Sequence, residues 1–268
     1  MDAGGMLAYY SVALRSQQSL KEIQRMNKSI SSSVLSLVVL LVVSVGCNQS
    51  QDSGANVTGN TTTAATPASP SGLEGSYDIS GMNENGAGAY KGSLTVTPRG
   101  EVYQFSWDTA GKKYDGVGVR TDKSVAAAFA SGDNGEGCGV VLYKIGADGT
   151  LDGKAGYWGN NSSETEIAKR TSGTDLEGDY EVSGKNTAGQ NYTGKLGVKK
   201  AGAGYTFSWN AGSPFEGFGI RQGDKVAVGI GGSKCGFVSY EIAGDGTLNG
   251  KWGGYGSKSV GTETAKKK

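Results

Sequence analysis

Histidine is missing from this chain of 268 residues, proline occurs only 4 times, and neither charge sign is in excess. Without histidine the chain can form no Ser-His or Cys-His nucleophile pair and no imidazole metal site. The 26 basic and 25 acidic residues give a formal net charge of +1, which provides no bulk attraction for nucleic acid. Since we also find no metal-ligand cluster and no phosphate-binding loop, the sequence predicts a protein that is not an enzyme, holds no cofactor or metal, and binds no nucleic acid.

Helical periodicity is scarce as well. After residue 72 no window shows the 3-4 spacing of apolar side chains that an amphipathic helix needs. Apolar and polar residues alternate instead, as in Tyr103-Gln-Phe105-Ser-Trp107. The 47 glycines lack a collagen-like period and arrive, often as Asp-Gly, at the spacing of turns between short strands. The predicted fold class is therefore all-β.

The chain from residue 73 onward contains one sequence unit twice. The segment from Tyr103 to Trp107 returns as Tyr205-Thr-Phe-Ser-Trp209. Further pairs recur around it in the same order: Leu73-Glu-Gly-Ser-Tyr77 and Leu176-Glu-Gly-Asp-Tyr180, Gly116-Val-Gly-Val-Arg120 and Gly217-Phe-Gly-Ile-Arg221, Asp148-Gly-Thr-Leu151 and Asp245-Gly-Thr-Leu248. We predict two tandem modules, residues 73–170 (the first repeat) and 176–265 (the second repeat), joined by residues 171–175.

Each repeat is predicted to contain eight short antiparallel strands, at 73–79, 90–97, 102–107, 114–120, 124–130, 139–145, 151–157 and 164–170, and at 176–182, 192–199, 204–209, 215–221, 225–230, 236–242, 248–254 and 260–265. Strands joined by hairpins lose their free edges when they close, so we predict that each repeat forms a small up-and-down, calycin-like barrel. A two-sheet sandwich and one larger structure pooling both repeats are the competing arrangements. The predicted core is Leu94, Val96, Tyr103, Phe105, Trp107, Leu196, Val198, Tyr205, Phe207 and Trp209.

The N-terminal residues predict a cellular address. The apolar run from Val34 to Gly46 is shorter than the roughly 20 residues of a membrane-spanning helix and has the length of a secretory signal. We interpret residues 1–46 as the signal region, with Met26 as the true start. Residues 47–72 have almost no large apolar side chain, so we expect a lipid anchor followed by a disordered linker.

Val45-Gly46-Cys47 resembles a bacterial lipobox, in which the cysteine is lipidated and becomes the first mature residue. This predicts lipid attachment at Cys47 and contact with a membrane through the acyl chains. Asn48 is not the aspartate associated with inner-membrane retention, so we expect a location in the cell envelope, at the outer membrane or the cell surface. The alternative is an ordinary secretion signal followed by a chance cysteine.

Trp107, Arg120, Trp209 and Arg221 are the repeated residues that we select as ligand-binding or structural. A Gly-x-Gly segment precedes each arginine, and we expect the tryptophan of the preceding strand to lie over this bare glycine face. A guanidinium stacked on each tryptophan would then close the barrel. The alternative is a repeated arginine that binds an anion.

Two further pairs of residues occupy equivalent places in the repeats. Cys138 and Cys235 could form a disulfide after export, but only if the repeats pack about a local two-fold axis, so we favour two buried free thiols. Glu166 and Glu263 are interpreted as solvated or salt-bridged strand residues.

Taken together, these segments resemble the bacterial lipoproteins labelled fibronectin-binding proteins, whose modules run Leu-Glu-Gly-x-Tyr, Tyr-x-Gly-x-Leu, Tyr-x-x-x-Trp, Gly-x-Gly-x-Arg and Asp-Gly-x-Leu-x-Gly-x-Trp. The resemblance covers residues 73–265. The last segment is complete at Trp252, but the first repeat has Ala155 at that place, which predicts a shifted final strand. The resemblance implies a binding role at the cell surface.

The leading functional hypothesis is a lipid-anchored, non-enzymatic binding protein whose partner is a macromolecule at the cell surface, in one version an adhesin for an extracellular matrix protein. The alternative is a carrier in the cell envelope that holds a small ligand in the mouth of the barrel. Eight-stranded barrels either fill their interior with side chains or hold one small molecule, so both hypotheses fit the predicted fold.

Overall fold

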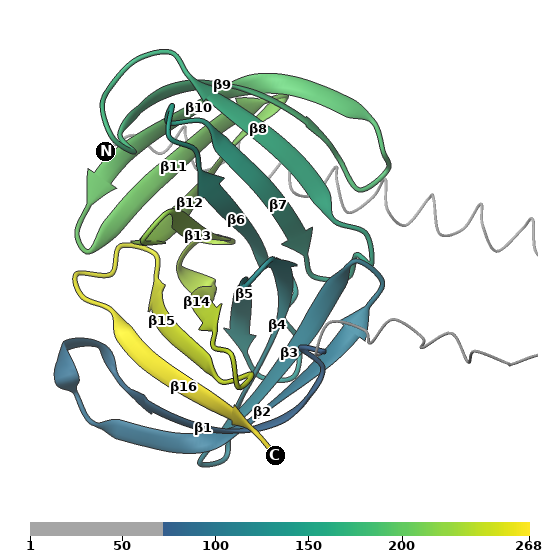
Figure 1. Ribbon diagram of the computed structural model, residues 1–268, viewed down its shortest axis with the longest axis vertical. Coiled ribbons are helices and arrows are strands. Elements are labelled where there is room, and N and C mark those ends of the chain that lie inside the picture. The colour runs from purple at the N-terminus through teal and green to yellow at the C-terminus, as the bar shows by residue number, and fades with distance from the viewer. Residues whose placement is uncertain (1–71) are drawn as a thin grey trace, which may run out of the picture. The chain divides into compact units, whose positions relative to one another are not determined.

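The computed structural model describes residues 72–268, which are almost entirely β-structure (Figure 1). The predicted signal region, Met26, Cys47 and the linker up to residue 71 lie outside the described residues. Within the described part of the chain, no helix is long and apolar enough to span a membrane. The elements are β1 (Gly75–Met82), η1 (Glu84–Gly86), β2 (Ala89–Arg99), β3 (Val102–Thr109), β4 (Lys112–Thr121), β5 (Ser124–Ser131), β6 (Gly139–Ile145), β7 (Leu151–Tyr157), β8 (Glu164–Arg170), β9 (Gly178–Lys185), β10 (Asn191–Ala201), β11 (Gly204–Ala211), β12 (Ser213–Gln222), β13 (Lys225–Ile230), η2 (Gly232–Lys234), β14 (Gly236–Ile242), β15 (Leu248–Gly254) and β16 (Gly261–Lys267).

The predicted fold class is confirmed: the protein is all-β, and its strands form two closed, antiparallel, eight-stranded barrels. Barrel B is one uninterrupted meander from β6 to β13, closed where β13 pairs with β6. Barrel A consists of β1–β5 and β14–β16, closed where β1 pairs with β16. Barrel B, residues 139–230, is thus inserted between the fifth and sixth strands of barrel A.

The prediction that each repeat closes its own barrel is therefore wrong. Strand β5 is the fifth strand of the first repeat. It pairs with β14, the sixth strand of the second repeat, and not with β6, which follows it in the chain. The predicted joint at residues 171–175 lies inside barrel B, where it connects the paired strands β8 and β9. The observed pairing is possible because β6 and β14 are equivalent strands of the two repeats. Strand β5 can therefore form the same kind of ladder with either of them.

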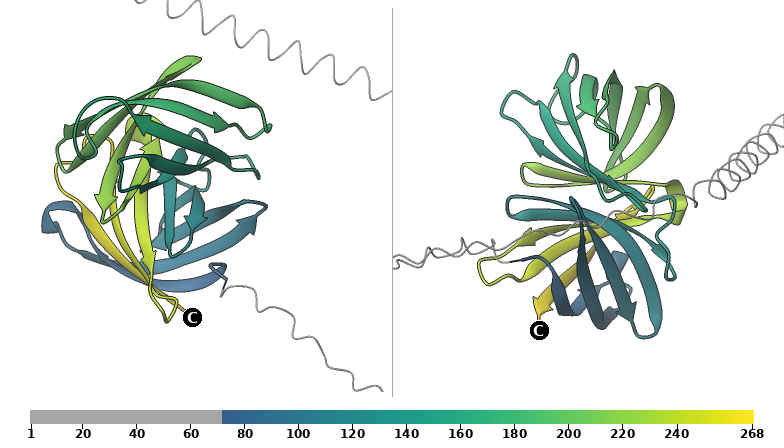
Figure 2. Two further views of the ribbon diagram at one scale, coloured as in Figure 1. Left: turned by 45° about the horizontal axis from the view of Figure 1, so that its top comes forward. Right: turned by 90° about the vertical axis from the view of Figure 1, so that its right-hand side faces the viewer.

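The outer faces of the central strands explain why the two barrels stay together. Side chains that point away from both barrel interiors form one buried apolar cluster between the barrels: Val102, Val117, Val119, Ala126, Ala128, Cys138, Val140, Leu142, Phe218, Ile220, Ala227, Cys235 and Phe237. Figure 2 shows the two barrels stacked on one another. A single barrel would expose its half of the cluster to water, at a cost of about 25 cal/mol per Å² of apolar surface.

The connections between the barrels are joined by a disulfide. The chain leaves barrel A after β5 and returns to it after β13, and Cys138 and Cys235 lie at the ends of these two crossovers with their Cα atoms 5.8 Å apart. The preference for two free thiols is wrong. The two crossovers lie side by side, which is the arrangement that a local two-fold axis gives to equivalent positions, and this allows the two cysteines to form the bridge.

Each barrel is closed at one end by the Leu-Glu-Gly-x-Tyr segment. Leu73 and Leu176 are buried in the two cores, and the hydroxyls of Tyr77 and Tyr180 donate to their carbonyls over 2.6 and 2.8 Å. Gly178 adopts a φ of +152°, and a Cβ there would lie 2.0 Å from the Ser172 carbonyl oxygen, so no side chain is tolerated at this bend. The barrels are thus cups with one closed end.

Most of the predicted core is confirmed. Leu94, Val96, Phe105, Trp107 and their counterparts in the second repeat are buried, whereas Tyr103 and Tyr205 are half-buried. The ring that lies over the glycine face belongs mainly to phenylalanine, not to tryptophan. A Cβ on Gly118 would lie 2.4 Å from Phe105 Cε2, and the antiparallel register pairs Phe105 with Gly116 while Trp107 faces Tyr114.

The final strand of the first repeat is not shifted. Leu151 faces Ala168 in the same register in which Leu248 faces Ala265. Ala155 simply takes the place of Trp252, and the nearby Trp158 packs against the apolar cluster between the barrels instead. The prediction of a shift was wrong because the register is set by the alternation of buried residues and by the turn, which both repeats share, and not by the tryptophan.

Candidate binding pockets at the open ends of the barrels

A buried glutamate lies in the interior of each barrel, near its open end. Glu263 on β16 is 6% exposed and Glu166 on β8 is 7% exposed. The interpretation of both as solvated or salt-bridged residues is wrong. They share a strand face with the fully buried Ala265 and Ala168, because residues two apart on a strand point the same way.

Three neutral donors hold the carboxylate in barrel A. The indole N–H of Trp107 donates to Glu263 Oε1 over 3.1 Å, and the hydroxyl of Tyr240 donates to the same oxygen. The hydroxyl of Tyr90 donates to Oε2 over 2.9 Å. These residues come from β2, β3, β14 and β16, so the site exists only once the barrel has closed.

Barrel B repeats this arrangement around Glu166. Trp209 donates to Oε1 over 3.1 Å together with Tyr143, and Tyr192 donates to Oε2 over 3.0 Å. The duplication has therefore kept one constellation of two tyrosines, one tryptophan and one glutamate in both barrels, although each constellation combines residues from two repeats.

Burial changes the acid–base properties of these groups. It raises the pKa of Glu263, an effect that the three donors only partly offset. Burial and the adjacent carboxylate also raise the pKa values of Tyr90 and Tyr240 far above their usual range. The phenols therefore stay protonated at neutral pH and act as hydrogen-bond donors.

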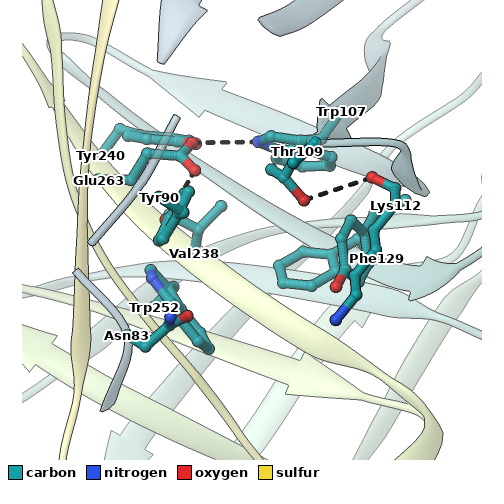
Figure 3. A pocket seen from close by; sticks show the side chains of 12 residues that line it. Asn83, Tyr90, Trp107, Thr109, Lys112, Phe129, Val238, Tyr240, Trp252 and Glu263 are labelled. Carbon is teal, nitrogen blue, oxygen red and sulfur yellow. Dashed lines mark hydrogen bonds between the residues drawn. The ribbon is translucent and has the colours of Figure 1, made fainter. Parts of the chain in front are cut away.

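The pocket of barrel A opens above Glu263 and has a volume of about 320 Å³. Figure 3 shows the Glu263 carboxylate beside Trp107, Tyr240 and Tyr90, with the rings of Phe129 and Trp252 among the other lining side chains. The lining residues are Asn83, Tyr90, Trp107, Thr109, Ala110, Lys112, Tyr114, Phe129, Val238, Tyr240, Trp252 and Glu263. Half of these residues are aromatic, and a cavity lined mainly by apolar surface with a few polar groups is typical of small-molecule sites.

The pocket of barrel B is smaller, about 220 Å³, and more acidic. Ala155 stands where barrel A has Trp252, and a second carboxylate, Glu164, stands where barrel A has Gly261. Burial first, and the charge of Glu166 in addition, raise the pKa of Glu164. The two pockets therefore share their inner end but differ in their walls.

Neither buried carboxylate has a cationic partner among the described residues. The four ion pairs of this part of the chain all lie at the surface and do not include Glu166 or Glu263. Residues 72–268 also contain no group of three or more acidic or cysteine side chains that could hold a metal ion. Asp115 is also buried without an ion pair, but it accepts from Gln104 and Ser106 and lines neither pocket. The two glutamates are the buried carboxylates that have no cationic partner and also face a cavity.

Of the residues selected from the sequence, Trp107 and Trp209 line the pockets, whereas the arginines do not. Arg120 and Arg221 lie toward the closed ends, where Arg120 donates to the Asp122 carbonyl and Arg221 forms a 2.6 Å ion pair with Asp175. The predicted stacking on tryptophan is wrong, because Trp107 faces Tyr114, and six residues of extended strand, roughly 20 Å, separate Tyr114 from Arg120.

Sequence reasoning found the glutamates but assigned them to the surface. The usable signal was their recurrence at equivalent positions, two residues before an alanine on the inward face. The sequence also selected the two tryptophans, but it could not pair them with the glutamates, because Trp107 is 156 residues from Glu263.

Comparisons with protein-family models, with curated proteins and with solved structures found no match to this chain. The resemblance to fibronectin-binding lipoproteins therefore stays a prediction.

Proposed function

We propose that this protein is a non-enzymatic binding protein that holds a small molecule in the open end of its barrels, with barrel A as the main site. The observation that supports this proposal best is the buried Glu263, which has no cationic partner among residues 72–268 and faces a cavity walled by aromatic rings. Side chains that only filled the barrel would leave neither the cavity nor the lone carboxylate.

The geometry supports this reading in two further ways. The volume of about 320 Å³ lies within the range of roughly 300–1,000 Å³ typical of small-molecule pockets. In addition, Leu73 fills the closed end of barrel A, so a ligand would enter and leave through the open end.

The test is native mass spectrometry of the purified protein, together with thermal stabilisation by a panel of small molecules. Two matched variants assign the site: Val238→Phe places a ring in the pocket of barrel A, and Val141→Phe does the same in barrel B. We expect Val238→Phe, but not Val141→Phe, to remove most of the stabilisation. Absence of any bound mass and of any stabilisation would refute the proposal.

We further propose that the protein acts in the cell envelope. The predicted lipid anchor at Cys47 supports this location, and so does the Cys138–Cys235 disulfide, since disulfides persist mainly in oxidising compartments outside the cytosol. Labelling of cells with a clickable fatty acid should mark the protein but not a Cys47→Ala variant. The adhesin role rests on the family resemblance alone and stays a prediction.

A further inference from the structure

The rings in the pocket of barrel A are set at steep angles to one another. Phe129 makes interplanar angles of 54° with Trp107 and 80° with Tyr114, with ring centroids 5.1 and 5.7 Å apart. On the other side of the pocket, Tyr90 and Trp252 meet at 69°. Phe105 stacks on Trp107 at 29°, but the other pairs do not lie face on face, and Tyr90, Trp107, Tyr114, Phe129 and Trp252 all line the one cavity.

Barrel B differs in this respect. Phe215 lies nearly parallel to Trp209, at an interplanar angle of 10° and a centroid distance of 4.9 Å, so that each ring covers a face of the other. The wall formed by Trp252 in barrel A is missing, because Ala155 stands there. The open box of aromatic faces is thus a property of barrel A.

The acidic group inside this box, Glu263, has hydrogen-bonding capacity left over. A carboxylate accepts about four hydrogen bonds, and Glu263 receives three, two at Oε1 and one at Oε2. All three donors are neutral, so they orient the carboxylate without cancelling its charge. The only cationic side chain of the lining, Lys112, is solvent-exposed.

We propose that the pocket of barrel A binds an organic ammonium ion, with its alkyl groups against the faces of Tyr90, Trp107, Phe129 and Trp252 and its charge toward Glu263. The proposal rests on the proposed function and adds the chemical class of the ligand. Aromatic faces attract ammonium groups through the negative face of the ring, an interaction that reaches about 2 kcal/mol or more when the cation is desolvated. A quaternary ammonium suits the site best, because it has no N–H groups that would stay unpaired against the rings.

The test compares a cation with a neutral molecule of the same shape. Choline and 3,3-dimethyl-1-butanol differ only in that a carbon atom replaces the charged nitrogen. Isothermal titration of the oxidised full-length protein at pH 7.5 should show choline binding about 10- to 30-fold more tightly than the alcohol, the ratio that corresponds to the energy of one desolvated cation–π contact. Tetramethylammonium should bind as well, since it is the head group alone.

Variants separate charge from shape. Glu263→Gln should lower the affinity for choline at least tenfold and change that for the alcohol less than twofold, whereas Glu166→Gln in barrel B should leave both unchanged. Trp252→Ala gives barrel A the wall of barrel B and should weaken choline binding even if Glu263→Gln does not fold. Circular dichroism spectra and melting midpoints establish that each variant is folded.

Several outcomes would overturn the inference. Equal affinity for choline and the alcohol would refute the ammonium class but leave the proposed binding function intact. Choline binding that survives Val238→Phe and is lost in Val141→Phe would refute the assignment to barrel A. If neither compound nor any other small molecule binds, both the inference and the proposed function fail.

Discussion

Breaking the disulfide between Cys138 and Cys235 should destabilise the protein more than any single substitution at its surface. The two cysteines are 97 positions apart, and the loop they close contains the whole of barrel B. In the unfolded chain this link removes a large number of conformations, so its loss makes unfolding more favourable.

The size of the effect follows from the loop length. The chain-entropy relation gives about 4.7 kcal/mol for a closed loop of about 100 residues, and measured losses for native disulfides are typically about 2–5 kcal/mol. For a domain of about 150–250 residues, each kcal/mol lowers the melting midpoint by about 2–4 °C. We therefore expect the midpoint to fall by roughly 4–20 °C.

The assay is urea unfolding of the oxidised and the reduced protein, followed by tryptophan fluorescence. Comparing the two redox states of one sequence avoids the cavities that Cys→Ala substitutions would leave at these buried positions. As a control, the Cys138→Ala, Cys235→Ala double variant should show no difference between oxidising and reducing buffer. A loss below about 1 kcal/mol in the native sequence would refute the reasoning, because it would mean that the unfolded chain gains little freedom from the cut.

Three further predictions concern the buried glutamate, the inserted barrel and the closed ends. Because its folded pKa is raised, Glu263 contributes stability that is fully present below its unfolded value of about 4.3 and is lost as the pH rises through the folded pKa. Glu263→Gln removes this dependence. In urea unfolding, the free energy of unfolding of the variant should therefore rise relative to that of the native chain between pH 4 and pH 7. Parallel plots of the two free energies against pH would contradict the pKa shift. A fragment of residues 136–233 contains every strand of barrel B and should give a β-type circular dichroism spectrum. It should also aggregate, because its apolar outer face is exposed to water. A random-coil spectrum would show that barrel B does not fold without barrel A. Leu176→Ala should lower the free energy of unfolding, measured in urea, by about 2–5 kcal/mol. Glu177→Ala, at the exposed neighbouring position, is the matched control and should lower it by less than about 1 kcal/mol. Equal losses would rule out the closure of barrel B by Leu176.

The strands and turns could be read from the sequence because they depend on neighbouring residues. Strands such as Gly139–Ile145, Leu151–Tyr157 and Gly236–Ile242 have the predicted bounds, and the strands that do not match differ from their predicted bounds by a few residues at the ends. Alternating side chains fix the inward face of a strand, and glycines at positive φ, such as Gly149, fix the turn that follows. These are local rules, so a single sequence is enough.

The location of the glutamates shows where such local rules fail. The strand alternation places each glutamate on an inward, apolar face, where a carboxylate is unfavourable. Local reasoning avoids this cost by assigning the residue to the surface. In the folded protein the conflict is resolved by Trp107, Tyr90 and Tyr240, which reach Glu263 from strands that are distant in the sequence. Whether a buried charge is tolerated depends on partners that only the closed barrel brings together.

The sequence by itself determined that the chain forms sixteen short strands in two related sets and which side chains of most strands face inward. Only the tertiary structure decided which strands close which barrel, and with that the pairing of Cys138 with Cys235 and the makeup of both pockets. The physical reason is the duplication: β6 and β14 offer β5 nearly the same edge, so the energy of the ladder does not distinguish them. The choice falls to non-local terms, namely the apolar layer between the barrels and the disulfide that links the two crossovers.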